Sequence, residues 1–217
     1  DAGKLLAALM RQPQPVLFDS TTVSHPLAVS GMACRLPGGV NTPGQLWRAL
    51  CQSECHITSQ PPSRYTQVCD AYQAPPAVRC GAFLEDVECF DAEHFGLSRA
   101  QAEQMDAHVR LMLEVVQEAL VDAGWGSKQL QASKVGVFAA APHQGFGLPM
   151  GFGSVSRTVS QVLRVEGPSE DFEAACTSSH LAIHRAWESL QRGECEVAVV
   201  AGARLLLLPL SGMGLLQ

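Results

Sequence analysis

The sequence lacks the features that mark several classes of protein. Its 217 residues include 15 Lys and Arg against 21 Asp and Glu, which gives a net charge of −6. A chain with no basic excess has no general attraction for nucleic acid or for an anionic membrane surface, so we expect neither as a partner. The most apolar stretch, 197–210, is broken by Gly202, Arg204 and Pro209, and therefore predicts no membrane span. The absence of an internal repeat argues against a solenoid.

Eight cysteines are present, but their spacing matches neither a disulfide framework nor a metal site. They are scattered through an otherwise ordinary globular composition, at positions 34, 51, 55, 69, 80, 89, 176 and 195. We therefore predict reduced thiols in the cytoplasm or another reducing intracellular compartment. Cys51 and Cys55 lie beside His56, but no second cluster supplies the two further ligands that a zinc site needs, so we expect no bound metal.

The chain divides into an N-terminal tail and one folded region. Residues 1–26 carry three prolines, which is typical of a linker or of the end of a preceding element. Residues 27–217 carry the strand and helix patterns. The first residue is Asp1 with no recognisable signal peptide, and the chain stops at Gln217 straight after an apolar run. We interpret the sequence as a piece of a longer polypeptide that is incomplete at its C-terminus.

Strand patterns alternate with helix patterns, which favours an α/β layered fold. Short apolar runs predict buried strands at 27–32, 134–141 and 196–201. Apolar periodicity, start signals and stop signals predict helices that begin after Asn41 or Thr42, begin at Ser98, run from 106 to 123, run from 155 to 163, and run from 177 to 192. Residues 53–82 are rich in Pro, Ser and Gln and are predicted to be irregular.

One cysteine has a position that favours chemistry. A short β-like run at 171–174 ends in small residues, Cys176 follows, and a long helix pattern begins directly after it. A thiol at such an elbow faces the free N–H groups and the positive dipole end of the helix. That environment favours thiolate over thiol, so Cys176 is our candidate nucleophile. The competing interpretation is an inert thiol buried in the core.

The elbow resembles the active-site segment of the β-ketoacyl synthases, the condensing enzymes of polyketide and fatty-acid synthesis. EAACTSS (173–179), GEC (193–195) and Ala201-Gly202 are similar to the family's cysteine motif, the end of its following helix and the strand after it. Further blocks match in the family's order. They are VSGMACRLPGG (29–39), GAFLEDV (81–87), FDAEHFGLS (90–98), MD (105–106), RLMLEV (110–115), EAL (118–120), DAG (122–124), GVF (136–138) and GPS (167–169). Many blocks in order are more specific than any single motif.

The resemblance implies a thiolase-like layered α-β-α fold of which only the N-terminal half is present. It implies that Cys176 takes an acyl group as a thioester, that its own N–H is an oxyanion donor, and that a malonyl-type extender is then condensed. Acyl groups would arrive on the phosphopantetheine of an acyl carrier protein or on coenzyme A, with no cofactor bound directly. The family also implies a homodimer and two catalytic histidines from the C-terminal half, so we expect this chain alone not to condense.

Several positions depart from the family pattern. Glu173-Ala174 stands for Asp-Thr, His180 for Leu, Ala107-His108 for Pro-Gln, and Arg204 for an apolar residue; the interval 138–167 is short. These changes keep open a degenerate, non-condensing domain that serves dimerisation or carrier-protein docking. A thiolase-type enzyme, which would need a second cysteine in the C-terminal half, is the third interpretation.

Three further features have ordinary structural interpretations. His180 and His184 follow Cys176 on one helix face, but three ligands on one straight helix span too far for a metal. We expect His184 to be a hydrogen-bonded structural residue and His180 to face the core or a neighbour. Gly151-x-Gly153 is a weak match to a dinucleotide loop and indicates tight packing instead.

Overall fold

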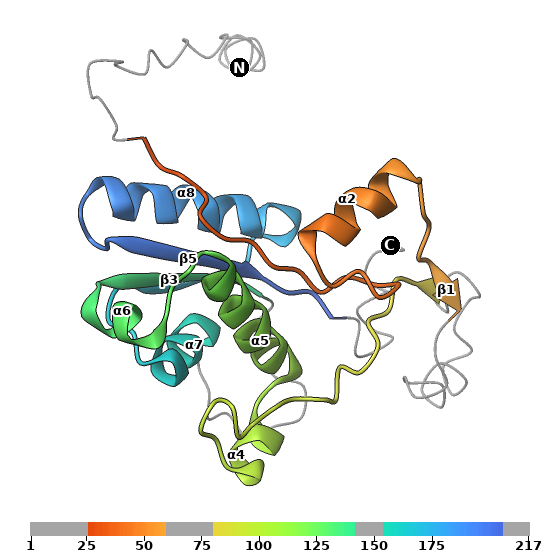
Figure 1. Cartoon of the computed structure of the whole chain (residues 1–217), viewed down its shortest axis with the longest axis horizontal. Helices are drawn as coiled ribbons and strands as arrows, with labels where there is room; N and C mark the ends of the chain where they lie inside the picture. The colour runs from red at the N-terminus through yellow and green to blue at the C-terminus, as the bar shows by residue number, and fades with distance from the viewer. Residues whose placement is uncertain (1–25, 60–79, 142–153, 206–217) are drawn as a thin grey trace, which may run out of the picture.

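A three-stranded parallel sheet lies at the centre of the molecule (Figure 1). The computed structural model describes residues 26–59, 80–141 and 154–205. The sheet contains β3 (Val135–Ala140), β4 (Ser169–Phe172) and β5 (Val197–Gly202) in the order β4-β3-β5. Parallel strands need crossover connections, and helices supply them here: α7 (Val155–Leu163) joins β3 to β4, and α8 (Ser178–Gln191) joins β4 to β5.

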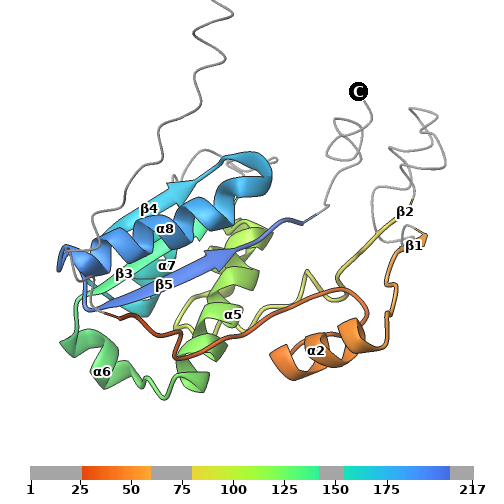
Figure 2. The same cartoon turned by 90° about the horizontal axis from the view of Figure 1, so that it is seen from above.

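The central strand β3 is buried at every position because helices cover both faces of the sheet. Side chains alternate between the two faces of a strand, and each face of β3 joins its own cluster. Val137 and its same-face neighbours pack with α5 (Ala107–Asp122) and α7. Phe138 packs with Ala182 and Ala186 of α8. Figure 2 shows α8 on one side of the sheet and α5 and α7 on the other, so the architecture is α-β-α, as predicted.

Local signals set the helix boundaries. Asp106 caps α5 through the N–H of His108, and Gly124 with φ of 76° follows its end. Ser98 forms a capping box with Gln101 at the start of α4 (Arg99–Gln104). The described residues also form the helices α2 (Pro43–Cys51) and α6 (Ser127–Ala132). Thr42, one of the two predicted caps, accepts the N–H of Gln45 in the first turn of α2.

The predicted buried strand at 27–32 is wrong. Residues 26–30 are exposed, and this segment has no strand pairing in the described structure. Its backbone binds a helix instead: the Met32 N–H donates to Asp122 of α5 at 2.9 Å. Gly31 lies so close to α5 that a Cβ there would be 2.2 Å from the carbonyl oxygen of Ala119. The apolar run is therefore extended chain laid over α5.

The strand before the cysteine begins earlier than predicted. We expected it at 171–174, but β4 spans Ser169–Phe172, because residues 173–177 form the turn into α8. Within 53–82, predicted to be irregular, β1 (Thr58–Ser59) pairs antiparallel with β2 (Cys80–Gly81).

Some sequence predictions cannot be compared with the fold. The linker at 1–26 lies almost entirely outside the described residues, and Gly151 and Gly153 lie wholly outside them. Among the residues that are described, no helix is long and apolar enough to cross a membrane.

Candidate active site

Cys176 lies in a short turn at the carboxyl end of the sheet. The turn is a single 3₁₀ segment, η2 (Ala175–Thr177), which follows β4 and runs directly into α8. The thiol is free and the residue is exposed. The cysteine therefore occupies the strand-to-helix junction that the sequence predicts, with its sulfur open to a reaction partner.

Hydrogen bonds within the turn fix its shape. The Ser178 hydroxyl accepts the N–H of Ala174 at 2.8 Å and donates to the carbonyl of Ala175 at 2.8 Å. The Thr177 hydroxyl donates to the carbonyl of Ala174 at 2.7 Å. These bonds hold Ala175 at φ of 48°, a left-handed conformation that is costly for a residue with a Cβ. The backbone on the N-terminal side of Cys176 is thus a tight, side-chain-bonded bend.

The N–H of Cys176 is available to a ligand. The N–H groups of Thr177 and Ser178 are used within the turn, donating to the carbonyls of Ala174 and Ala175. Among the described residues, none accepts the N–H of Cys176, and no side chain caps the start of α8. An available N–H beside an exposed thiol at a helix start can stabilise the oxyanion that forms on the carbonyl oxygen of an acyl group when the thiol attacks it.

Close packing holds the first turn of α8 against β5. A Cβ placed on Gly202, the last residue of β5, would lie 2.9 Å from the hydroxyl oxygen of Ser179. The absent side chain therefore lets the helix approach the strand. The Ala-Gly end of β5, which resembles the family motif, therefore packs closely against the first turn of α8.

The two histidines after Cys176 both lie on the exposed part of α8. His180 is exposed, so it does not face the core of the described residues, and a contact with a neighbour stays a prediction. We expected His184 to be hydrogen-bonded, but its Nε2 lies 4.0 Å from a carboxylate oxygen of Glu188, which is too far for a hydrogen bond. Its ring stacks on Trp187 instead, with centroids 6.0 Å apart and planes inclined by 18°. An exposed turn of α8 leaves these rings to pack on one another rather than on the core.

Metal ligands do not gather near the cysteine or elsewhere in the described ranges. Over 26–59, 80–141 and 154–205, no three His, Cys, Asp or Glu side chains are placed to hold a metal ion. Cys51 and Cys55, which were considered with His56 as possible metal ligands, are both exposed free thiols.

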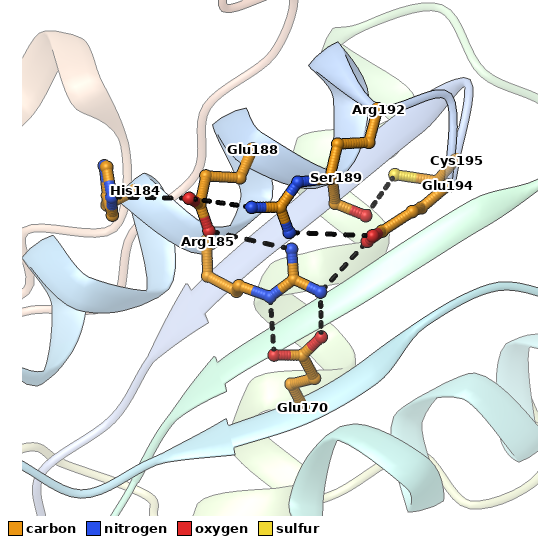
Figure 3. A network of polar contacts seen from close by, with 8 residues as sticks. All are labelled: Glu170, His184, Arg185, Glu188, Ser189, Arg192, Glu194 and Cys195. Atoms are coloured by element: carbon orange, nitrogen blue, oxygen red, sulfur yellow. Dashed lines mark hydrogen bonds and ion pairs between the residues drawn. The ribbon is translucent and has the colours of Figure 1, made fainter.

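A charged network that was not predicted from the sequence joins α8 to the strand before the elbow (Figure 3). Arg185 donates through Nε to Glu170 of β4 at 3.1 Å and places Nη2 2.9 Å from the other carboxylate oxygen. The same Nη2 donates to Glu194, after α8, at 2.9 Å. The sequence carried no signal for this pair, because Glu170 lies outside the strand pattern expected at 171–174 and Arg185 is an ordinary charged residue of a helix pattern.

A buried histidine was also missed as a structural contact. The ring of His108, at the start of α5, binds the Asp106 carboxylate through Nδ1 at 2.8 Å. Its Nε2 lies 3.1 Å from the N–H of Leu205, which follows β5. An amide can only donate, so Nε2 is the acceptor and Nδ1 carries the proton. The departure from Pro-Gln at 107–108 was the visible signal.

Comparison with known proteins identifies the family. The model of the β-ketoacyl synthase N-terminal domain matches residues 24–217. Phthioceranic/hydroxyphthioceranic acid synthase of Mycobacterium tuberculosis is 37% identical over 85% of this chain, which spans 10% of that protein. Pikromycin polyketide synthase component PikAII of Streptomyces venezuelae is 37% identical over 88% of the chain, or 6% of its own length.

Solved structures agree with the sequence relatives. The ketosynthase from module 6 of the bacillaene synthase of Bacillus subtilis 168 superposes with a TM-score of 0.77 at 30% identity, over 86% of this chain and 33% of that one. The oxazolomycin ketosynthase domain of Streptomyces albus gives a TM-score of 0.75, also at 30% identity. The chain therefore belongs to the β-ketoacyl synthase family, matches its N-terminal domain, and has the thiolase-like fold of polyketide synthase ketosynthases.

Proposed function

We propose that Cys176 is the acyl-accepting nucleophile of a ketosynthase that extends polyketide or fatty-acyl chains. The observation that carries this proposal is the exposed thiol beside its own N–H, which no described residue accepts, at the bend between β4 and α8. The family relationship supports the assignment because the elbow matches the cysteine motif of the condensing enzymes. Residues 27–217 are then the N-terminal region of the ketosynthase domain, preceded by a linker.

The chemistry begins with transthioesterification. The Cys176 thiolate attacks the carbonyl carbon of an acyl thioester, forming a carbon–sulfur bond and a tetrahedral oxyanion toward which the Cys176 N–H donates. The bond to the carrier's sulfur then breaks, and the carrier thiolate leaves and takes a proton. The carrier is the phosphopantetheine arm of an acyl carrier protein, or coenzyme A, so the site needs no resident cofactor.

Condensation follows with a malonyl-type extender. Carbon dioxide leaves the extender, the resulting carbanion attacks the Cys176 thioester, a carbon–carbon bond forms, and the cysteine thiolate is released. In the family two histidines from the C-terminal half assist this step.

The described structure leaves three large apolar side chains of α8 exposed, Leu181, Ile183 and Trp187, and we propose that the C-terminal half packs over them.

An edge strand and the free cysteines of the described residues support a homodimer and an intracellular setting. Within the described sheet, β4 is an edge strand, and edge strands pair with a second chain when they are not otherwise protected. We propose a homodimer of the complete protein. The cysteines of the described residues are free thiols, which fits a reducing compartment such as the cytoplasm.

The test is site-specific acylation. The complete native polypeptide is incubated with an acyl thioester of N-acetylcysteamine, digested, and its peptides weighed. We expect a hydroxylamine-sensitive acyl group on Cys176 that is lost in Cys176→Ala and kept in Cys89→Ala, a matched control because Cys89 is also an exposed free thiol. Equal labelling of all exposed cysteines would contradict the proposal.

A second candidate function is a ketosynthase-like domain that docks carrier proteins or dimerises without condensing. The exposed His180 on α8, where the family has Leu, and the substituted Glu173-Ala174 before Cys176 are its support. Addition of a malonyl carrier to the acylated protein separates the two. Release of carbon dioxide with a β-ketoacyl product supports condensation, and a stable acyl-Cys176 without product supports docking.

A further inference from the structure

The two elements that flank the Cys176 bend are joined at a second place by one side chain. The bend itself spans 173–177, with β4 before it and α8 after it. Farther from the thiol, Arg185 on α8 binds both carboxylate oxygens of Glu170 on β4, through Nε at 3.1 Å and Nη2 at 2.9 Å (Figure 3). A planar guanidinium that holds a carboxylate by two nitrogens fixes direction as well as distance.

A second carboxylate extends the clamp to the far end of α8. Nη2 of Arg185 also donates to Glu194 at 2.9 Å, in the turn between α8 and β5. Hydrogen bonding from Ser189 and from Arg185 lowers the pKa of Glu194, so this carboxylate stays ionised and keeps the pair charged at neutral pH. One guanidinium thus binds β4, which leads into the bend, and the turn that leads out of α8.

A second arginine in the network makes no contact with β4. Arg192 lies at the end of α8 and binds Glu188 at 3.1 Å, with Nη1 3.8 Å from Glu194. The network therefore contains two cations of the same kind, of which Arg185 alone ties the helix to the strand before the cysteine among the contacts of the described residues.

We infer that Arg185 is a positioning residue for Cys176: its clamp on Glu170 fixes the start of α8 relative to the end of β4. The thiol and its N–H sit at the junction of these two elements, so a small change in their relative placement moves both groups together. Arg185 lies nine residues beyond Cys176 and acts through the helix rather than on the reacting atoms. The inference rests on the proposed role of Cys176 as acyl acceptor.

The experiment compares cysteine reactivity in three single variants of the complete native polypeptide. Arg185→Gln removes the clamp, Glu170→Gln removes its partner with little change in volume, and Arg192→Gln removes a cation of the same network without touching β4. Acyl transfer to Cys176 and its alkylation by iodoacetamide are both followed by peptide mass across pH. Thermal melting verifies that each variant is folded at the assay temperature.

We expect Arg185→Gln and Glu170→Gln each to slow acyl transfer to Cys176 by about tenfold, because displacement of a reacting group by about 1 Å costs up to a hundredfold. The double variant should be no slower than either single, since both remove one clamp. Arg192→Gln should keep the wild-type rate even where it lowers the melting temperature. Should Arg185→Gln fail to fold, Glu170→Gln decides the question.

Two results would overturn the inference: wild-type acyl transfer in a folded Glu170→Gln or Arg185→Gln variant, or an equal loss in Arg192→Gln. The alkylation arm separates this failure from failure of the proposed function. If wild-type Cys176 takes no acyl group, the acyl-acceptor role fails. A changed pH profile of Cys176 alkylation in the clamp variants but not in Arg192→Gln still supports positioning, and an unchanged profile rejects it.

Discussion

The imidazole of His108 and the backbone N–H of Leu205 form a hydrogen bond of 3.1 Å across 97 positions of sequence. The bond ties the start of α5 to the chain that leaves β5, and both residues are buried. His108→Leu removes the acceptor and leaves the buried amide unpaired, so we expect a loss of about 1–3 kcal/mol in stability. Hydrogen exchange followed by mass spectrometry should show faster exchange at the peptide that contains Leu205.

A conservative replacement tests whether the acceptor matters. His108→Gln keeps a side-chain oxygen that can accept the Leu205 N–H, and it should retain more of the protection than His108→Leu. His94→Leu is the control, because His94 is an exposed histidine on the surface. Equal exchange in His108→Leu and the wild type would contradict the assigned role.

Acid should destabilise the start of α5, where His108 binds, because it protonates the Asp106 carboxylate. Burial raises the pKa of this carboxyl, but the hydrogen bonds from the side chain and backbone of His108 outweigh burial and hold the pKa below its ordinary value of 3.8. A carboxyl whose pKa is lowered on folding contributes stability above its unfolded pKa. That contribution is lost as pH falls below 3.8 and through the lower folded pKa.

Pulse proteolysis with pepsin, run between about pH 5 and pH 2, measures this loss. Asp106→Asn keeps a capping side chain but cannot ionise, so its stability should change less with pH across this window than that of the wild type. Parallel acid curves for the two proteins would contradict the assignment.

The left-handed conformation of Ala175 predicts how substitutions at this residue change the stability of the bend at Cys176. At φ of 48°, a glycine is unstrained and a β-branched residue is strongly disfavoured. Ala175→Gly should leave stability unchanged or raise it by up to about 1 kcal/mol, and Ala175→Val should lower it by about 1–2 kcal/mol. Ala175→Val should also slow acylation of Cys176, since the next residue is displaced.

Ala174→Val is the matched control for that experiment. Ala174 has φ of −134° with ψ of 43°, so this substitution adds the same methyl groups at a residue whose φ is not left-handed. Thermal melting and peptide mass mapping give the two readouts. A larger effect at Ala174 than at Ala175 would show that strain in the bend is not the cause.

Two glycines should respond in opposite ways to alanine. Gly31→Ala places a Cβ 2.2 Å from the carbonyl oxygen of Ala119, which is backbone and cannot rotate away. We expect the segment over α5 to detach at its edge, with a loss of about 1–3 kcal/mol. Gly44→Ala meets nothing within 4 Å and lies inside α2, so it should stabilise by up to about 1 kcal/mol. Proteolysis rates of the folded protein measure both.

The sequence predicted the elements whose partners are close in the chain. The helix expected at 106–123 is α5, and the strand expected at 134–141 is β3, because density and periodicity of apolar residues report burial directly. The bend at Cys176 was also predictable, since a short run of small residues between a strand pattern and a helix pattern is typical of a turn. The identity of the cap of α2 was not, because Asn41 and Thr42 are equally good candidates until the backbone is placed.

The errors share a physical cause, which is dependence on distant partners. The apolar run at 27–32 has the pattern of a strand, but the N–H of Met32 goes to Asp122 on a helix, 90 residues away. The Arg185–Glu170 clamp was missed because neither residue is unusual alone; only the packing of α8 on β4 brings them together. Local pattern does not contain that information.

The N-terminal segment that crosses α5 has a consequence for synthesis on the ribosome. Its anchors are long-range: Arg35 pairs with Glu118, 83 residues later in the chain. At translation rates of about 5–20 residues per second, the segment waits roughly 4–17 seconds before its binding helix exists. During that interval the apolar residues of the segment have no helix to pack against, and the strands β3 to β5 have not yet been synthesised. The N-terminal segment therefore cannot take its final position until 83 further residues, up to Glu118 of α5, have been synthesised.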